Sequence, residues 1–155
     1  MSRFKEILVP VDFSDHSIAA LEAAVELARV FDSKLHLLHC YQINPGGLLP
    51  YGIAFPESYF TDIRDAASRQ LADWQEKHVP AGIPVNASTM SEVPSEAIVK
   101  TAKEIGADLV VMGTRGLTGF KHVTLGSVAE RTIRFAPCPV MIVHAPGSNQ
   151  ADGDD

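Results

Sequence analysis

The chain has 155 residues, of which 46% are hydrophobic and 21% are charged, and its formal net charge is −6. A chain of this length folds most economically as one domain, which buries about two thirds of the surface that the unfolded form exposes. The acidic balance argues against a nucleic-acid partner, and no apolar stretch approaches the length of a membrane span.

The cysteines and the first residues bear on the cellular compartment. Cys40 and Cys138 are far apart in the sequence and form no C-x-x-C motif, so a disulfide, a zinc site and a thioredoxin-type motif are poorly supported. The first residues lead into a short apolar run without a small-residue cleavage site. We therefore expect a cytoplasmic protein without membrane contact.

Short apolar runs bounded by turn residues predict five strands, at 4–11, 34–41, 83–90, 108–113 and 140–143. The first and fourth runs are almost uninterrupted, which is typical of strands covered on both faces of a parallel sheet. The third run, from Ile83 to Met90, alternates apolar and polar residues. This alternation indicates a less buried strand at the edge of the sheet.

Apolar residues spaced by three and four predict four helices, at 14–31, 56–78, 94–105 and 127–136. Ser14 is a good N-cap for the first helix, and Ser127 opens the fourth. Pro94 starts the third helix, and Gly106 is placed to end it.

Two of these helices have a face that is expected to be buried. The predicted stripe of the second helix consists of Phe60, Ile63, Ala67, Leu71 and Trp74. Within it, Trp74 is assigned to the core rather than to a stacking platform. The residues of the fourth helix that are expected to face inward are Val128, Ala129, Thr132, Ile133 and Ala136.

The alternation of strands and helices predicts an α/β fold. We expect a three-layer open sheet of five mainly parallel strands in the order 3-2-1-4-5, with helices on both faces. Residues 1–144 form this single domain, and the polar segment 145–155 is predicted to be a disordered tail. The connection from Gln42 to Pro56 is long for a compact domain, and both a binding segment and a plain surface connection remain open.

The most informative residues lie where two of the strands end. In such a sheet, ligands bind beyond the carboxyl ends of the strands, at the point where the strand order reverses. The first strand ends in Pro10-Val11-Asp12, and the fourth runs into the pattern Gly113-x2-Gly116-x9-Gly126-Ser127. A glycine-rich loop that leads into a helix start suits phosphate. The two segments together suit a nucleotide, with its base and ribose near the first strand.

Structural roles remain open for each part of this pattern. Gly113 and Gly116 could serve only a tight turn, Ser127 could be only an N-cap, and Asp12 could only cap the first helix. Arg115, Lys121 and His122 could offset phosphate charge or form a solvated loop face. His36 and His39, which flank the second strand, are interpreted as structural.

Other nucleotide and catalytic motifs are missing. The sequence has no G-x-x-x-x-G-K-[ST] loop, no G-x-G-x-x-G fingerprint, no G-x-S-x-G elbow, and no Cys or His pair at metal spacing. No metal ligand is therefore predicted among the protein side chains.

The glycine–serine pattern is accompanied by Ile-Leu-Val-Pro-Val-Asp at 7–12, Leu-Leu-His-Cys at 37–40, Ala-Asp-Leu-Val-Val-Met-Gly at 107–113 and Ala-Pro-Cys-Pro-Val at 136–140. Together these segments resemble the ATP-binding branch of the universal stress protein family, over nearly the whole chain. The resemblance implies the fold of the adenine nucleotide alpha hydrolase group. It also implies a homodimer that pairs the last strand, Val140 to Val143, across a two-fold axis.

The same resemblance implies an ATP site, with Mg²⁺ or Mn²⁺ as the accompanying cation. At the adenine and ribose, the resemblance places Pro10, Val11 and Asp12, with Met112 nearby, and Cys40 at an adenine contact that is commonly valine in the family. Gly113 and Gly116 would border the ribose and phosphates. The residues at the phosphates would be Gly126, Ser127 and Val128.

The leading hypothesis is a cytoplasmic stress-response or regulatory protein that acts as a nucleotide-dependent switch or as a very slow ATPase. An efficient hydrolase needs a placed base and a metal carboxylate. The sequence offers only Asp12 and Asp15, so binding is favoured over turnover. The alternative is a dimeric interaction module with a protein partner and an architectural glycine loop. An adenylating enzyme is less supported, because the H-x-G-H and S-G-G-x-D-S signatures are missing.

Overall fold

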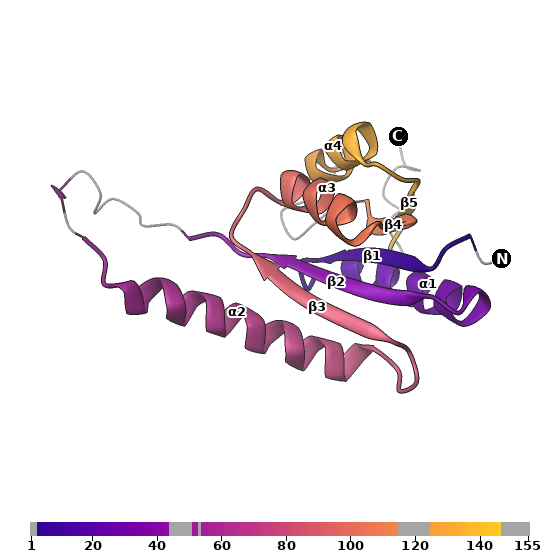
Figure 1. Ribbon diagram of the computed structural model, residues 1–155, viewed down its shortest axis with the longest axis horizontal. Helices are drawn as coiled ribbons and strands as arrows, with labels where there is room; N and C mark the ends of the chain where they lie inside the picture. Colours follow the sequence, from indigo (N-terminus) through magenta and orange to yellow (C-terminus); the bar gives the residue numbers. More distant parts are fainter. Residues whose placement is uncertain (1–2, 44–50, 53, 115–124, 147–155) are drawn as a thin grey trace, which may run out of the picture.

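The computed structural model describes residues 3–43, 51–52, 54–114 and 125–146. Within these residues, strands and helices alternate along the chain (Figure 1). In chain order they are β1 (Glu6–Val11), α1 (Asp15–Phe31), β2 (Lys34–Cys40), α2 (Glu57–His78), β3 (Val85–Met90), α3 (Pro94–Ile105), β4 (Leu109–Gly113), α4 (Ser127–Phe135) and β5 (Val140–Val143). In this described part, no helix has the length and apolar character that a membrane span requires.

The strands form one sheet in the order β3-β2-β1-β4-β5, and every neighbouring pair is parallel. The predicted strand order is therefore confirmed. After β3 the chain crosses back to place β4 beside β1, so the strand order reverses between these two strands. In open parallel sheets, this reversal point is where the carboxyl ends of the strands border a ligand site.

Helices cover both faces of the sheet, as predicted: Figure 1 shows α1 and α2 on one side and α3 and α4 on the other. The core divides in the same way. Ile7 and Val9 of β1 belong to the cluster with Leu71 and Trp74 of α2, whereas Leu8 belongs to the cluster with α3 and α4. Because both faces of β1 are covered, its apolar run is uninterrupted.

Local signals at the ends of α1 and α3 are confirmed. The Ser14 side chain accepts a hydrogen bond from the Ser17 N–H at 3.3 Å, as the N-cap of α1. Helix α3 begins at Pro94 and is followed by Gly106, whose φ of 63° lies in the left-handed region that favours glycine. These contacts join near neighbours in the chain, which is why the sequence predicts them.

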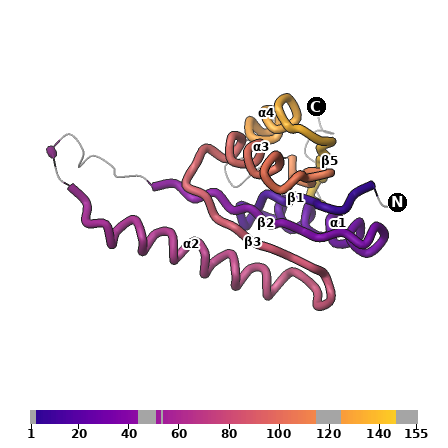
Figure 2. Tube along the Cα trace, in the orientation of Figure 1, coloured from indigo at the N-terminus to yellow at the C-terminus, as the bar shows by residue number. Residues whose placement is uncertain are grey.

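The buried stripe predicted for α2 is correct only in its C-terminal part. Ala67, Leu71 and Trp74 are buried, so Trp74 belongs to the core as expected. Phe60, at the start of the predicted stripe, is 39% exposed. The reason is that the N-terminal half of α2 runs past the carboxyl end of β3 and beyond the sheet (Figure 2).

The inward face predicted for α4 also needs a correction. Ala129 and Thr132 are buried, but Ile133 is 48% exposed. Each residue turns an α-helix by about 100°, so Ile133 lies beside the narrow face that packs on the rest of the fold rather than within it.

Strand β3 lies at the edge of the sheet, as predicted, but it begins at Val85 rather than at Ile83. Its residues from Asn86 to Ser88 are all exposed instead of alternating, because the strand lies at the margin of both helix layers. At the other end of the chain, Ala145 of the predicted tail is buried. Residues 147–155, and most of the connection from Gln42 to Pro56, lie outside the described residues.

Candidate functional site

The carboxyl ends of β1 and β4 lie side by side at the reversal point of the sheet. The two strands pair in parallel, with Leu8 opposite Val110. The same register, continued along both strands, places residues 10–12 level with residues 112–114. The structure thus brings together the two segments that the sequence analysis assigned to one site.

Gly113, the last residue of β4, has no room for a side chain. A Cβ atom added there would lie 2.6 Å from the Cβ of His16 and 3.0 Å from the His16 carbonyl oxygen. Backbone atoms cannot move aside as the end of a flexible side chain can, so glycine here allows the first turn of α1 to pack directly on β4. Glycine is therefore needed at position 113 for close packing against His16 and not for a tight turn.

The described ends of the glycine-rich segment are joined by a backbone hydrogen bond. The Gly126 N–H donates to the Thr114 carbonyl oxygen at 2.7 Å, which places the start of α4 next to the carboxyl end of β4. Gly126 is the N-cap of α4 and supplies no side-chain cap. The alternative in which Ser127 is the N-cap is therefore wrong, and Ser127 is the first helical residue. The other predicted residues of this segment lie outside the described residues: Arg115, Gly116, Lys121 and His122.

The first turn of α4 presents backbone N–H groups that have no partner inside the helix. Such groups and the positive end of the helix dipole together attract anions. Ser127 is exposed and Val128 is partly buried, so this helix start lies at the surface of the described part of the fold.

Asp12 follows β1 and organises the first turn of α1. Its Oδ1 accepts hydrogen bonds from the N–H of Ser14 at 3.0 Å, from the Ser14 hydroxyl at 2.5 Å and from the Ser17 hydroxyl at 2.6 Å. The Asp12 N–H in turn donates to the Ser17 Oγ at 2.9 Å. Ser14, and not Asp12, is therefore the N-cap of α1. The Asp12 carboxylate instead holds Ser14 and Ser17, and these hydrogen bonds fix it at the edge where β1 and β4 end.

In the described part of the chain, two buried polar atoms beside Gly113 have no hydrogen-bond partner: Nδ1 of His16 and Oγ1 of Thr114. His16 is the residue that contacts Gly113. Thr114 follows Gly113 in the chain and is 1% exposed. Buried polar groups are nearly always hydrogen-bonded to protein, water or a ligand. These two atoms fit a site at which a polar ligand or an ordered water completes the structure.

Cys40 ends β2, opposite Met90 of β3. Burial, followed by the nearby carboxylate of Glu92, raises the pKa of the Cys40 thiol from 9.0 to about 11. Burial likewise raises the pKa of Cys138, with a smaller contribution from Asp108. Both thiols are free, as expected, and both are protonated at neutral pH. Cys40 thus offers a neutral, polarisable surface at its strand end.

The histidines of β2 have structural partners. His36 Nε2 lies 2.5 Å from Glu6 Oε2, and His39 Nδ1 donates to the Val11 carbonyl oxygen at 2.8 Å. The second contact ties the end of β2 to the end of β1.

Three residues near the site escaped the sequence analysis: Phe13, His16 and Thr114. The backbone of Phe13 is left-handed, with a φ of 65°, and His16 of α1 lies against Gly113 at the end of β4. Neither feature leaves a short sequence motif. The one available signal is the position of Phe13 in the sequence, between the predicted site residue Asp12 and the N-cap Ser14.

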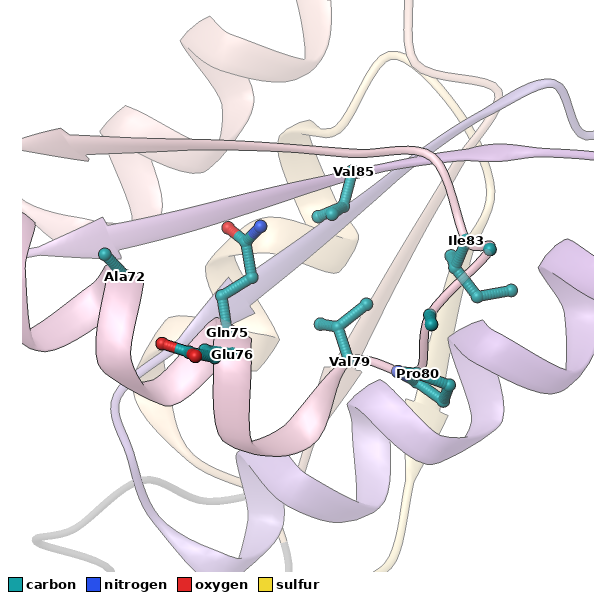
Figure 3. Close-up of a pocket in the computed structure, with 9 residues that line it drawn as sticks. Ala72, Gln75, Glu76, Val79, Pro80, Ile83 and Val85 are labelled. Atoms are coloured by element: carbon teal, nitrogen blue, oxygen red, sulfur yellow. The ribbon is translucent and has the colours of Figure 1, made fainter.

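A cavity of about 490 Å³ lies between the C-terminal end of α2 and the start of β3 (Figure 3). Gln75 and Glu76 of α2 and Ile83 and Val85 at β3 are among its lining residues. It opens at the amino end of the sheet and includes none of the predicted site residues. Among the described residues, no group of three His, Cys, Asp or Glu side chains could hold a metal ion.

A parallel sheet in this order, with helices on both faces, defines an open α/β domain of the architecture in which ligands bind beyond the carboxyl ends of the strands. The family model described as the universal stress protein family matches residues 3–144. The chain therefore belongs to the universal stress protein family.

Individual relatives agree with this assignment. The universal stress protein MJ0531 of Methanocaldococcus jannaschii is 33% identical over 143 residues, which cover 92% of this chain and 84% of that protein. The solved structure of MJ0577, from the same organism, has a TM-score of 0.77 and 27% identity, and the match covers 92% of this chain and 96% of that one. A universal stress protein solved in complex with cAMP has a TM-score of 0.62 and 26% identity, with coverage of 92% and 98%.

Proposed function

We propose that this universal stress protein binds ATP at the edge formed by the carboxyl ends of β1 and β4. The observation that carries the proposal is the hydrogen bond between Gly126 and Thr114, which sets the uncapped start of α4 beside that edge. The complex of a similarly folded relative with cAMP supports an adenine nucleotide as the class of ligand. The unpartnered Nδ1 of His16 and Oγ1 of Thr114 support a polar ligand there.

The residues divide into three roles in this proposal. The Asp12 carboxylate accepts hydrogen bonds from ribose hydroxyls. The N–H groups at the start of α4 bind phosphate oxygens, and Arg115, Lys121 and His122 offset phosphate charge. The apolar surface at the adenine is assigned to Pro10, Val11, Cys40 and Met112, with Gly113, Gly116, Gly126, Ser127 and Val128 along the ribose and phosphates.

The bound nucleotide would bring Mg²⁺ or Mn²⁺ with it, held chiefly by its own phosphates, because the described residues contain no metal cluster. Asp12 is engaged with Ser14 and Ser17, and Asp15 is exposed on the first turn of α1. An efficient hydrolase needs a base held against the attacking water. We therefore propose a cytoplasmic, dimeric regulatory protein in which ATP acts as a switch and hydrolysis is very slow.

The test is a double substitution at the start of α4, Gly126→Asp with Ser127→Glu. Two carboxylates at the N-terminus of α4 interact favourably with the helix dipole but repel phosphate. We therefore expect ATP binding to be lost while the fold is retained. Isothermal titration with ATP and Mg²⁺ measures the binding, and circular dichroism checks the fold. An unaltered dissociation constant in the double variant would contradict the proposed site.

The alternative, a protein-interaction module with an architectural glycine loop, gains support from the packing of Gly113 on His16, which explains that glycine without any ligand. The two functions differ in one outcome. If wild-type protein shows no heat of binding and no rise in melting temperature at millimolar ATP, the interaction module is favoured.

A further inference from the structure

Aromatic rings connect the candidate nucleotide site with α2. The ring of Phe13, the residue after Asp12, lies with its centroid 4.3 Å from that of His39 and 6.0 Å from that of Trp74. His39 is itself tied to the end of β1 through its hydrogen bond to the Val11 carbonyl oxygen. Phe13 thus packs between a fixed part of the sheet and the helix α2.

The backbone of Phe13 is in an unusual conformation. Its φ of 65° lies in the left-handed region, which among the described non-glycine residues is shared only by Asp32 at the end of α1. A bulky residue adopts this conformation only where surrounding contacts enforce it. For Phe13 these contacts are the two rings and the preceding Asp12, whose carboxylate is held by the hydroxyls of α1.

Helix α2 is held to the body by a small set of side chains. Its buried residues are Ala67, Leu71 and Trp74, and its N-terminal half extends past the sheet (Figure 1). Trp74 is the largest of the three, and Phe13 is the site neighbour that its ring contacts. The placement of α2 therefore depends on where the Phe13 ring lies.

We propose that occupancy of the nucleotide site is transmitted through Phe13 and Trp74 to α2, which makes α2 the element that reports bound nucleotide. This inference rests on the proposed function, because it needs a nucleotide at Asp12. Ribose hydroxyls that donate to the Asp12 carboxylate compete with the donors from Ser14 and Ser17. Since the strained backbone of Phe13 follows directly, this competition moves the ring that packs on Trp74. Because such coupling is reciprocal, the position of α2 also changes the affinity for nucleotide.

The chain contains one tryptophan, so the emission of selectively excited tryptophan reports on Trp74 alone. Full-length protein is titrated with ATP and Mg²⁺ while the emission is recorded, and equilibrium dialysis with labelled ATP measures binding independently. We expect a saturable emission change whose midpoint equals the dissociation constant from dialysis. Amide hydrogen exchange in α2 should also change when ATP is present.

The decisive variant is Phe13→Gly, because glycine keeps the left-handed backbone without strain and removes the ring. We expect it to bind ATP within about threefold of wild type but to lose the Trp74 emission change and the exchange response of α2. Phe31→Leu is the matched control. It removes a ring from the pair of Phe4 and Phe31, which lie 5.3 Å apart at the far end of α1, and should keep both responses.

The outcomes separate this inference from the function on which it rests. Binding by dialysis without an emission change in wild type would overturn the coupling and leave nucleotide binding intact. A full response in Phe13→Gly would overturn it as well. No binding by dialysis would overturn the proposed function, and the coupling with it.

Discussion

Single positions near the site are constrained for different physical reasons. Gly113 is glycine because a Cβ atom would collide with His16. Gly106 has open space around its Cα, and its constraint is the left-handed backbone that ends α3. The two glycines therefore respond differently to the same substitution. The sequence predicts the helix-ending role of Gly106, but it does not show the contact that constrains Gly113.

This difference predicts the effect of asparagine at each position. Asparagine tolerates the left-handed region, so Gly106→Asn should lower the free energy of unfolding by less than about 1 kcal/mol. Gly113→Asn forces α1 away from β4 and should cost at least about 2 kcal/mol. Urea denaturation of both variants measures these losses. Equal losses would show that Gly113 is not sterically constrained.

At the scale of elements, one hydrogen-bond network joins β1, α1 and the site. The Asp12 carboxylate accepts from two hydroxyls of the α1 start while it lies at the end of β1. The Asp12 side chain therefore has two roles: it stabilises the start of α1, and in the proposed function it binds the ribose of the nucleotide. Substitutions that change its charge or its donors should separate these two tasks.

Asp12→Asn retains an oxygen that can accept from Ser14 and Ser17 but removes the charge. We expect it to fold with stability within about 1 kcal/mol of wild type and to bind ATP several times more weakly. Ser17→Ala should do the reverse: it should lower the free energy of unfolding by about 1 kcal/mol without weakening ATP binding, because it removes a donor that competes with the ribose for Asp12. Thermal denaturation and equilibrium dialysis on both variants measure the two effects. Similar losses of affinity in both would contradict a direct contact between Asp12 and the nucleotide.

At the scale of the molecule, the sheet ends in two different edges. β3 forms one edge and β5 the other, and among the described residues β5 pairs only with β4. Met141 of β5 is 38% exposed, and an exposed apolar edge strand readily pairs with another strand. These features support the proposed homodimer through Val140 to Val143.

A charge on β5 should therefore break the dimer. Met141→Asp places two carboxylates near each other across the two-fold axis, where their repulsion opposes association. Analytical ultracentrifugation should give a dimer for wild type and a monomer for this variant. Asn86→Asp, on the exposed middle of β3, is the matched control and should remain dimeric. A dimer that survives Met141→Asp but not the control would place the interface at the opposite edge.

The sequence by itself determined the positions of strands and helices, the ends of α1 and α3, and the membership of Asp12 and Gly113 in one edge of the sheet. The elements and the helix ends follow from the hydrophobic period and from caps between near neighbours, which a short window of the sequence contains. The shared edge of Asp12 and Gly113 follows from the strand order expected for an alternating α/β chain. Only the tertiary structure decided the contact of Gly113 with His16 and the packing of Phe13 on Trp74. It also decided the exposure of Ile133. The reason is that these properties depend on contacts between residues far apart in the chain, and no local pattern records which distant residues become neighbours.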